Sequence, residues 1–210
     1  IQHDGLRPQA IVLDRVIESL GKTPEATFKQ LPRFVEHISA IDSLPGVRLF
    51  LNDNERPREE NLRSIRDAAG MGFRILKLIY TCAEAKPDGQ NLTIFERQRR
   101  HFREVRSAAG GSTYLLSCMI LSKRAGLGFV DSTRSGPNTR RQEIRGVIDS
   151  TLWAYPFNKR WYAVDSDAGY LATEVRDVRP LHGGWPLART WLCMIGLSCG
   201  DAFTADLWFL

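Results

Sequence analysis

The sequence predicts an α/β fold: a closed (β/α)8 TIM barrel that is irregular or one βα unit short. Short β-like runs alternate with helical patterns from the middle of the chain onward, which is typical of βα units and a parallel sheet. Residues 72–80 (GFRILKLIY) form a nearly continuous apolar run, as expected of a strand buried on both faces. Polar residues stand at the carboxyl ends of several predicted strands, where a barrel carries its active face. An open doubly wound sheet is the alternative, but its G-x-G-x-x-G fingerprint and the P-loop are both missing from the sequence.

The first part of the chain predicts two strands and three helices. The helix over Pro57–Gly70 has the clearest boundaries, because a proline and two glutamates open it and a glycine closes it. The other elements expected here are strands at Ile1–His3 and Val47–Leu51 and helices at Ala10–Leu20 and Pro32–Ile41.

A capping box, Thr93-Ile94-Phe95-Glu96, predicts a helix that runs to about Ala109. Its apolar residues share one face, and most of a cluster of arginines lies on the other. The remaining elements follow in alternation: strands at Thr113–Cys118, Leu127–Asp131, Trp161–Asp165 and Asp201–Thr204, and helices at Thr139–Leu152 and Pro186–Leu197. With Ile1–His3 counted, seven strand candidates are expected.

Length and composition limit the class of protein. The chain has 210 residues, of which 43% are hydrophobic and 25% charged, as expected of one globular domain over residues 1–210. No run reaches the roughly 18 apolar residues of a spanning helix, which excludes an integral membrane protein. The first five residues carry neither a basic nor an apolar signal region, so no secretory signal is expected.

The cysteines and histidines predict neither a metal site nor a disulfide framework. Cys82, Cys118, Cys193 and Cys199 form no C-x-x-C pair, and no histidine stands at ligand spacing to them. No metal and no cofactor are therefore expected. Four thiols in a chain of this length fit a reduced compartment, which favours the cytoplasm.

The net charge of +5 is partly clustered, because five arginines crowd one predicted helix. Nucleic-acid binding usually requires basic residues interleaved with exposed aromatic residues, or a known reading motif, and neither is found. A solvated helix face is the favoured interpretation, and a basic nucleic-acid-associated domain is the alternative. The arginines are Arg97, Arg99, Arg100, Arg103 and Arg106.

Six short segments match the motifs of one family, in the family's order. They are Ile1–Gly5 (IQHDG), Gly72–Tyr80 (GFRILKLIY), Leu115–Cys118 (LLSC), Val130–Asn138 (VDSTRSGPN), Val164–Asp167 (VDSD) and Gly196–Asp206, which opens GLSCG. The chain resembles the catalytic barrel of glycoside hydrolase family 36, the melibiase-type α-galactosidases. The resemblance implies a deletion between Val47 and Pro57, where the family has its third strand. Relatives in this family usually carry β-rich domains on either side of the barrel.

The resemblance places two catalytic positions in this sequence, and both are substituted. Ile79 stands two residues after Lys77, where the family motif has the nucleophilic aspartate. Asn138 follows Gly136-Pro137, where the motif has the aspartate that acts as general acid and base. A retaining glycosidase needs both carboxyl groups, so turnover is expected to be weak or lost.

The resemblance also implies a sugar-binding set that is mostly retained. Carboxylate and ammonium groups suit hydrogen bonding to sugar hydroxyls. Three functions are open: a diverged α-galactosidase rescued by other carboxylates, a non-catalytic domain that binds carbohydrate or a partner, and the nucleic-acid-associated domain. The expected partner is an α-galactoside or related oligosaccharide, without nucleic acid or membrane. The binding residues implied are Asp4, Lys77, Cys118, Asp131, Arg134, Asp165 and Asp167.

Overall fold

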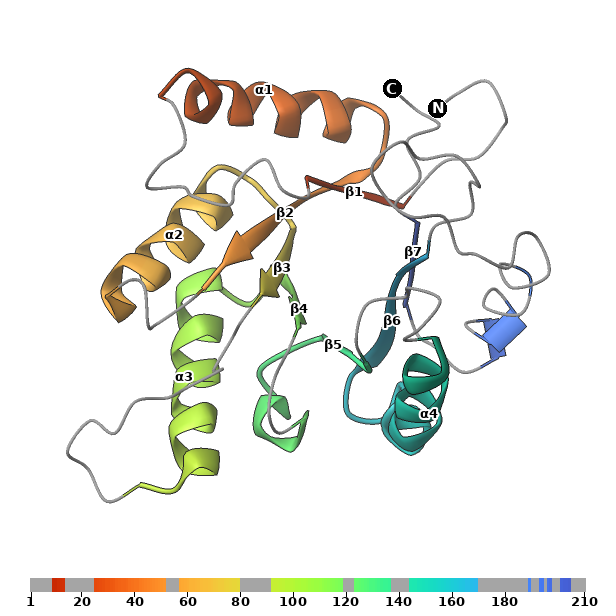
Figure 1. Ribbon diagram of the computed structural model, residues 1–210. Coiled ribbons are helices and arrows are strands. Elements are labelled where there is room, and N and C mark those ends of the chain that lie inside the picture. The colour runs from red at the N-terminus through yellow and green to blue at the C-terminus, as the bar shows by residue number, and fades with distance from the viewer. Residues whose placement is uncertain are drawn as a thin grey trace. The chain divides into compact units, whose positions relative to one another are not determined.

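The computed structural model describes residues 9–13, 25–51, 57–79, 92–118, 123–136, 144–169, 189, 193–194, 196–197 and 201–204. The chain divides into two compact units, Ile1–Asp131 and Ser132–Leu210. Both units are built from parallel strands with helices between them, so the α/β prediction holds (Figure 1).

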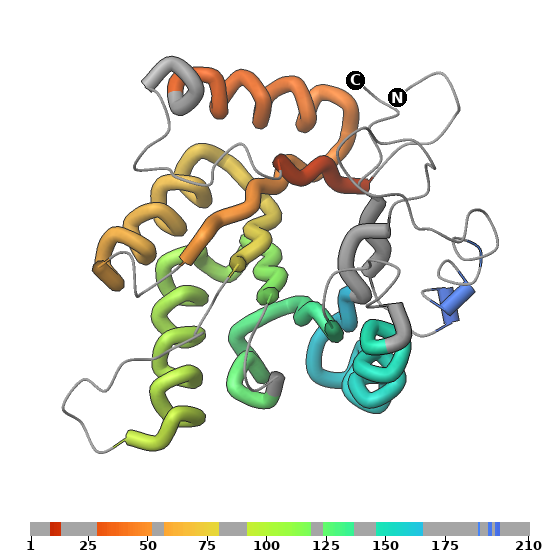
Figure 2. The backbone as a smooth tube through the Cα atoms, in the orientation of Figure 1, coloured from red at the N-terminus to blue at the C-terminus, as the bar shows by residue number. Residues whose placement is uncertain are grey.

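The first unit contains four parallel strands in the order β1-β2-β3-β4. Helices lead from one strand toward the next, and Figure 2 follows the backbone through α2 directly into β3. Parallel neighbours joined by helices form the βα units that the alternation predicted. The elements are β1 (Ala10–Leu13), α1 (Glu25–Ala40), β2 (Leu44–Phe50), α2 (Arg58–Gly70), β3 (Ile75–Ile79), α3 (Ile94–Ala109) and β4 (Tyr114–Ser117).

The core of the first unit lies between the strands and these helices. Alternate residues of each strand face it, since side chains along a strand alternate between the two faces. Leu49 of β2, Leu76 and Leu78 of β3 pack in one cluster with Ile65 of α2 and Phe102 of α3. The intervening residues of β2, β3 and β4 therefore face away from the helices.

Local signals in the sequence fix the ends of α2 and α3. Pro57 precedes α2, and acidic residues in its first turn complement the positive end of the helix. At the start of α3, Thr93 Oγ1 accepts a hydrogen bond from the Glu96 backbone N–H at 3.2 Å, and the Glu96 carboxylate accepts one from the Thr93 N–H at 2.8 Å. The capping box is confirmed, and Gly110, with φ of 79°, ends the helix.

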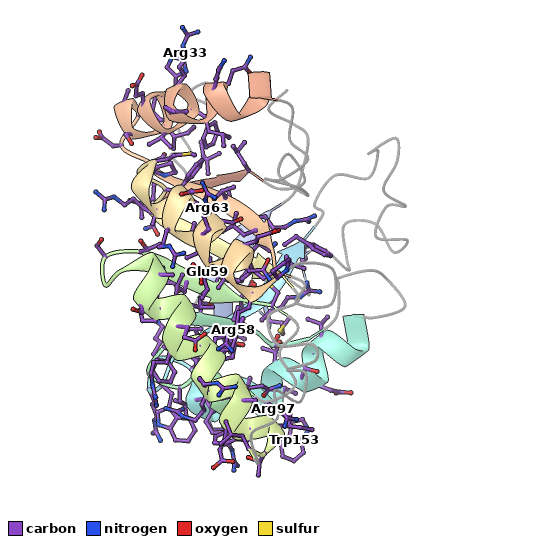
Figure 3. The ribbon with its side chains drawn as sticks, turned by 90° about the vertical axis from the view of Figure 1, so that its left-hand side faces the viewer. Arg33, Arg58, Glu59, Arg63, Arg97 and Trp153 are labelled. Atoms are coloured by element: carbon purple, nitrogen blue, oxygen red, sulfur yellow. The ribbon has the colours of Figure 1, made fainter. Side chains whose placement is uncertain are left out.

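Among the described residues, three ion pairs involve α2, at the helix surface shown in Figure 3; one of them joins Arg63 to Asp67. Arg58 pairs with Glu104 of α3, which ties the start of α2 to its neighbour. Glu59 and Arg66 pair within α2. These pairs are partly exposed, so each contributes little to the free energy of unfolding.

Three arginines of α3 hold the segment that follows β4 through η1 (Lys123–Gly126). Arg99 donates to the Leu127 carbonyl at 3.2 Å, and both Arg99 and Arg103 lie over the Phe129 ring. Arg106 donates to the carbonyls of Phe129 and Thr113, each at 2.7 Å. The interpretation of this face as merely solvated is therefore wrong for these three side chains, because they bind the chain itself.

The second unit contains three parallel strands in the order β5-β6-β7 and the helix α4. Ser135 Oγ and Thr151 Oγ1 of α4 share a buried hydrogen bond of 2.8 Å. The Val164 N–H donates to Oδ1 of Asn158, which fixes the start of β6. The elements are β5 (Ser132–Arg134), α4 (Ile144–Ala154), η2 (Tyr155–Phe157), β6 (Ala163–Gly169) and β7 (Asp201–Thr204).

The predicted helix at Ala10–Leu20 is wrong at its start. Ala10–Leu13 forms β1 and pairs with β2 in register, from Ala10 with Leu44 to Leu13 with Val47. A four-residue apolar run does not distinguish helix from strand by periodicity, and the pairing with β2 decides it here. Residues 14–20 lie outside the described part, as does the strand expected at Ile1–His3.

The helix expected to begin at Pro32 begins at Glu25 and keeps the proline inside it. Proline removes one hydrogen bond from a helix interior. Leu31, Val35 and Ile38 are spaced across Pro32 on the face that packs inward, so burial of this face supports the longer helix.

The strand expected at Leu127–Asp131 is also wrong. Gly128 has φ of 78°, and the N–H groups of Phe129 and Val130 both donate to the Gly126 carbonyl, so the segment is a turn. The strand is β5, which begins at Ser132. Its Ser-Thr-Arg sequence has no apolar pattern, although all three residues are buried.

The other predicted elements are confirmed as far as the described residues reach, with boundaries that move by a few residues. The strand expected from Trp161 begins at Ala163, and the strand at Asp201–Thr204 is β7. Within the expected helix Pro186–Leu197, residues 189, 193–194 and 196–197 are described, and they are helical. None of the helices within the described residues has the length and hydropathy needed to cross a membrane.

Candidate functional site

The face of β2–β4 that points away from the helices is arranged in layers. Arg48 and Lys77 are register partners on neighbouring strands, as are Phe50 and Ile79 one layer further along. Cys118 follows β4 directly, and its N–H donates to the Leu78 carbonyl at 2.8 Å, which places Cys118 beside the end of β3. The carboxyl ends of these strands therefore bring Lys77, Ile79 and Cys118 to one face.

Lys77 is the ionisable residue of β3, and its position is unusual. It is 7% exposed and lies between Ile75 and Ile79 on its face of the strand. A lysine is rarely buried to this extent unless it has a structural partner or a function. Arg48, its neighbour on β2, is half-buried.

Near the amino ends of the strands, Gly46 of β2 lies between Val12 of β1 and Ile75 of β3, and no space is left there for another carbon. A Cβ added at Gly46 would lie 2.8 Å from Cγ2 of Val12 and 3.1 Å from Cβ of Ile75. The glycine lets β1 and β3 bring these side chains together across β2. These side chains fill the face of the sheet next to Lys77, on the side of the amino ends of the strands.

Asp131 is placed differently from the other predicted site residues of the first unit. Its carboxylate pairs with Arg106 of α3 at 2.5 Å and accepts the Leu115 backbone N–H at 2.8 Å. These contacts tie the end of the η1 segment to α3 and β4. That Asp131 also contacts a sugar stays a prediction.

In the second unit, Arg134 of β5 and Asp165 of β6 are register partners, and both are buried. Arg134 Nε donates to the Gly136 carbonyl at 2.9 Å, and the Asp165 carbonyl accepts the Ser135 N–H at 2.7 Å. Since Ser135 reaches α4, the alternation of side chains puts Arg134 on the opposite face. The two predicted residues therefore lie together on the face that α4 does not cover.

Two of the predicted site residues, Asp4 and Asn138, lie outside the described residues, and Asp167 is described for its backbone in β6. No motif in the sequence singles out Arg48 as a site residue. The alternation within Val47–Leu51 would have placed it with Lys77 once the register of β2 and β3 was known.

The comparisons with known proteins identify structures with the same fold. No protein-family model matches the chain, and no curated protein matches it significantly. Among solved structures, the chain is similar to an α-galactosidase from Thermus thermophilus in complex with stachyose, with a TM-score of 0.61 and 20% identity over 86% of this chain. It is also similar to a monomeric dihydrodipicolinate synthase variant, with a TM-score of 0.57 and 13% identity over 94% of this chain.

The chain has the (β/α) barrel fold. Seven strands are seen in the part of the chain that the structure describes, in agreement with a barrel one unit short. The match covers 50% of the α-galactosidase chain and 58% of the synthase chain, so this chain spans about half the length of either. At these identities the similarity shows the fold, and the chemistry has to be argued from the residues.

Proposed function

We propose that this chain is an α-galactosidase-like barrel, related to glycoside hydrolase family 36, that binds α-galactosides without hydrolysing them. The observation that carries the proposal is the end of β3, where Ile79 shares a face with Lys77 and Cys118. The resemblance assigns the nucleophile to position 79. The lysine that accompanies the nucleophile is retained, and the nucleophile is replaced.

The substitutions remove hydrolysis for a chemical reason. In retaining glycosidases two carboxyl groups stand about 5–5.5 Å apart, one to attack the anomeric carbon and one to transfer the proton. The isoleucine side chain at position 79 has no lone pair with which to form a glycosyl ester. The amide of Asn138 has no acidic proton to give to the leaving oxygen.

Sugar binding does not need the two catalytic carboxylates, and the retained residues are suited to it. Nζ of Lys77 donates hydrogen bonds to sugar hydroxyls, and the apolar side chains of Phe50 and Ile79 suit the less polar face of a pyranose. The α-galactosidase with the similar fold is in complex with an oligosaccharide, stachyose, which supports this ligand class. On the motif resemblance alone, Asp4, Asp131, Arg134, Asp165 and Asp167 complete the proposed binding set.

Nucleic-acid binding, the alternative function, has less support than sugar binding. Arg99, Arg103 and Arg106 contact the chain's own carbonyls and the Phe129 ring, so they are engaged in holding the fold. A polyanion would have to compete with these contacts.

Titration calorimetry with methyl α-D-galactoside tests the binding, and release of nitrophenol from nitrophenyl α-D-galactoside tests the hydrolysis. The proposal expects saturable binding at millimolar concentration and no hydrolysis by the wild-type chain. Absence of binding, or turnover at the rate of a competent α-galactosidase, would contradict it.

Restoring the two carboxylates gives a sharper version of the test. The double variant Ile79→Asp, Asn138→Asp is expected to gain hydrolysis. The matched control is Ile79→Asn, Asn138→Asp, because asparagine has the size and polarity of aspartate but no nucleophilic carboxylate. Equal activity in the two double variants would mean that position 79 is not the nucleophile position.

A further inference from the structure

We propose that the segment formed by residues 152–161 binds the surface of an anionic lipid bilayer. The segment contains the end of α4, all of η2 and most of the turn that leads to β6. The sequence argument against a membrane concerned spanning helices, whereas a protein can also lie on a bilayer surface. The proposal goes beyond sugar binding and does not depend on it.

Four large side chains of this segment are exposed to solvent although they are mainly apolar. Their exposed fractions run from 48% for Trp161 to 82% for Trp153. Folding normally removes much of such a side chain from water, and apolar side chains that stay exposed as a group mark surfaces that contact a partner or a membrane. The four residues are Leu152, Trp153, Tyr155 and Trp161.

Packing of α4 against its own unit does not account for these residues. Val147, Thr151 and Ala154 are buried and lie at spacings of four and three, so they form the inner face of the helix. A rotation of about 100° per residue places Leu152 and Trp153 on the outer face. A surface helix normally presents polar side chains there, so a second apolar face needs another explanation.

The ring of Trp161 is held in place by its neighbours. It stacks on Phe157, with the ring centroids 4.7 Å apart and the planes inclined by 14°. The Phe157 ring also lies beside the buried Tyr162, at a centroid distance of 6.5 Å. Because Trp161 is already ordered, contact with a partner costs little conformational entropy.

The charged residues of the segment favour an anionic bilayer over a second protein. Lys159 and Arg160 are both exposed and stand directly before Trp161. Tryptophan and tyrosine concentrate at the membrane–water interface, and anionic headgroups attract lysine and arginine. Interfaces between proteins are depleted in lysine. An anionic bilayer therefore matches both the rings and the charges.

One carboxylate, that of Asp149, distinguishes this partner from a sugar. Asp149 lines a shallow hollow on the outer face of α4 together with Leu152, Trp153 and Pro156. A sugar ring in this hollow would use the carboxylate as a hydrogen-bond acceptor for its hydroxyls. Anionic headgroups would be repelled by the same carboxylate. The two ligands therefore predict opposite effects of replacing Asp149.

Co-sedimentation of the full chain with lipid vesicles tests the proposal. The vesicles are phosphatidylcholine alone and phosphatidylcholine with about one third phosphatidylglycerol. One basic residue near an anionic surface tightens binding about fivefold. We expect the chain to bind the anionic vesicles at least tenfold more tightly, and the double variant Lys159→Gln, Arg160→Gln to lose that difference. The matched control, Arg33→Gln, Arg63→Gln, removes the same charge from exposed positions of α1 and α2 and should retain most of the binding.

Two single variants test the rings and the carboxylate. Trp153→Ala should weaken binding severalfold, and Phe95→Ala, which removes an exposed ring from α3, should leave it unchanged. Asp149→Asn should strengthen binding. Circular dichroism verifies that each variant is folded.

Three results would overturn the proposal. The first is equal binding to the two kinds of vesicle, or binding to neither. The second is weaker vesicle binding by Asp149→Asn. The third is a dimer of the wild-type chain that Trp153→Ala dissociates, because a second copy would then cover the exposed rings.

Discussion

Arg106 is the residue of the first unit whose replacement should be most informative about stability. It donates from α3 to two carbonyls at 2.7 Å and a third, Gly110, at 3.2 Å, and it pairs with Asp131. Replacing Arg106 with alanine leaves a partly buried carboxylate and these carbonyls without their donor. Hydrogen bonds from charged groups are worth about 1.5–3 kcal/mol each, and partial exposure of this pair reduces the sum. We expect a loss of about 3 kcal/mol in the free energy of unfolding.

The matched control is Arg103→Ala, on the same helix. Arg103 is exposed and lies over the Phe129 ring at 5.9 Å, a contact worth about 0.5 kcal/mol. Urea unfolding followed by circular dichroism measures both variants, and with a slope of about 2 kcal/mol/M the Arg106→Ala midpoint should fall by more than 1 M. Equal midpoints for the two variants would refute the assignment of Arg106 as the residue that fixes the η1 segment.

Three further predictions concern local structure. Gly46→Ala should destabilise by about 1–3 kcal/mol in urea unfolding, because the new carbon would overlap Val12, whereas Gly70→Ala, with nothing within 4 Å, should be neutral or slightly stabilising. Thr93→Ala should cost about 1 kcal/mol by the same assay, since it removes the cap of α3. Hydrogen bonds from the Thr93 backbone and side chain hold the pKa of Glu96 below its ordinary value of 4.5, and NMR titration of Thr93→Ala should show that pKa rise. The stabilisation from Glu96 is therefore complete above pH 4.5 and is lost as the pH falls through the lowered pKa.

Sequence patterns predicted the elements that carry strong local signals. The capping box at Thr93 and the proline and glycine around Pro57–Gly70 fixed two helices within one residue, and the apolar run at residues 72–80 contained β3. These signals act within a few residues of one another, so they can be recognised without knowledge of the fold.

The predictions of secondary structure were wrong where contacts between distant segments determine it. Residues 10–13 are a strand because they pair with β2, and β5 is a strand of polar residues because its neighbours bury it. The contact of the Asp131 carboxylate with Arg106, which is 25 residues away, also depends on the fold and is not specified by any local signal. Arg48 and Lys77 are neighbours because of the register between β2 and β3. No motif in the sequence specifies that register.

The central claim is that a sugar binds at the carboxyl ends of β3 and β4. The most direct test is an NMR titration of the chain with methyl α-D-galactoside, following the backbone amides. The account predicts saturable shifts that are largest around Ile79 and Cys118, with little change at Trp153, which is exposed on α4. Shifts that are absent, or that gather away from the ends of β3 and β4, would contradict it.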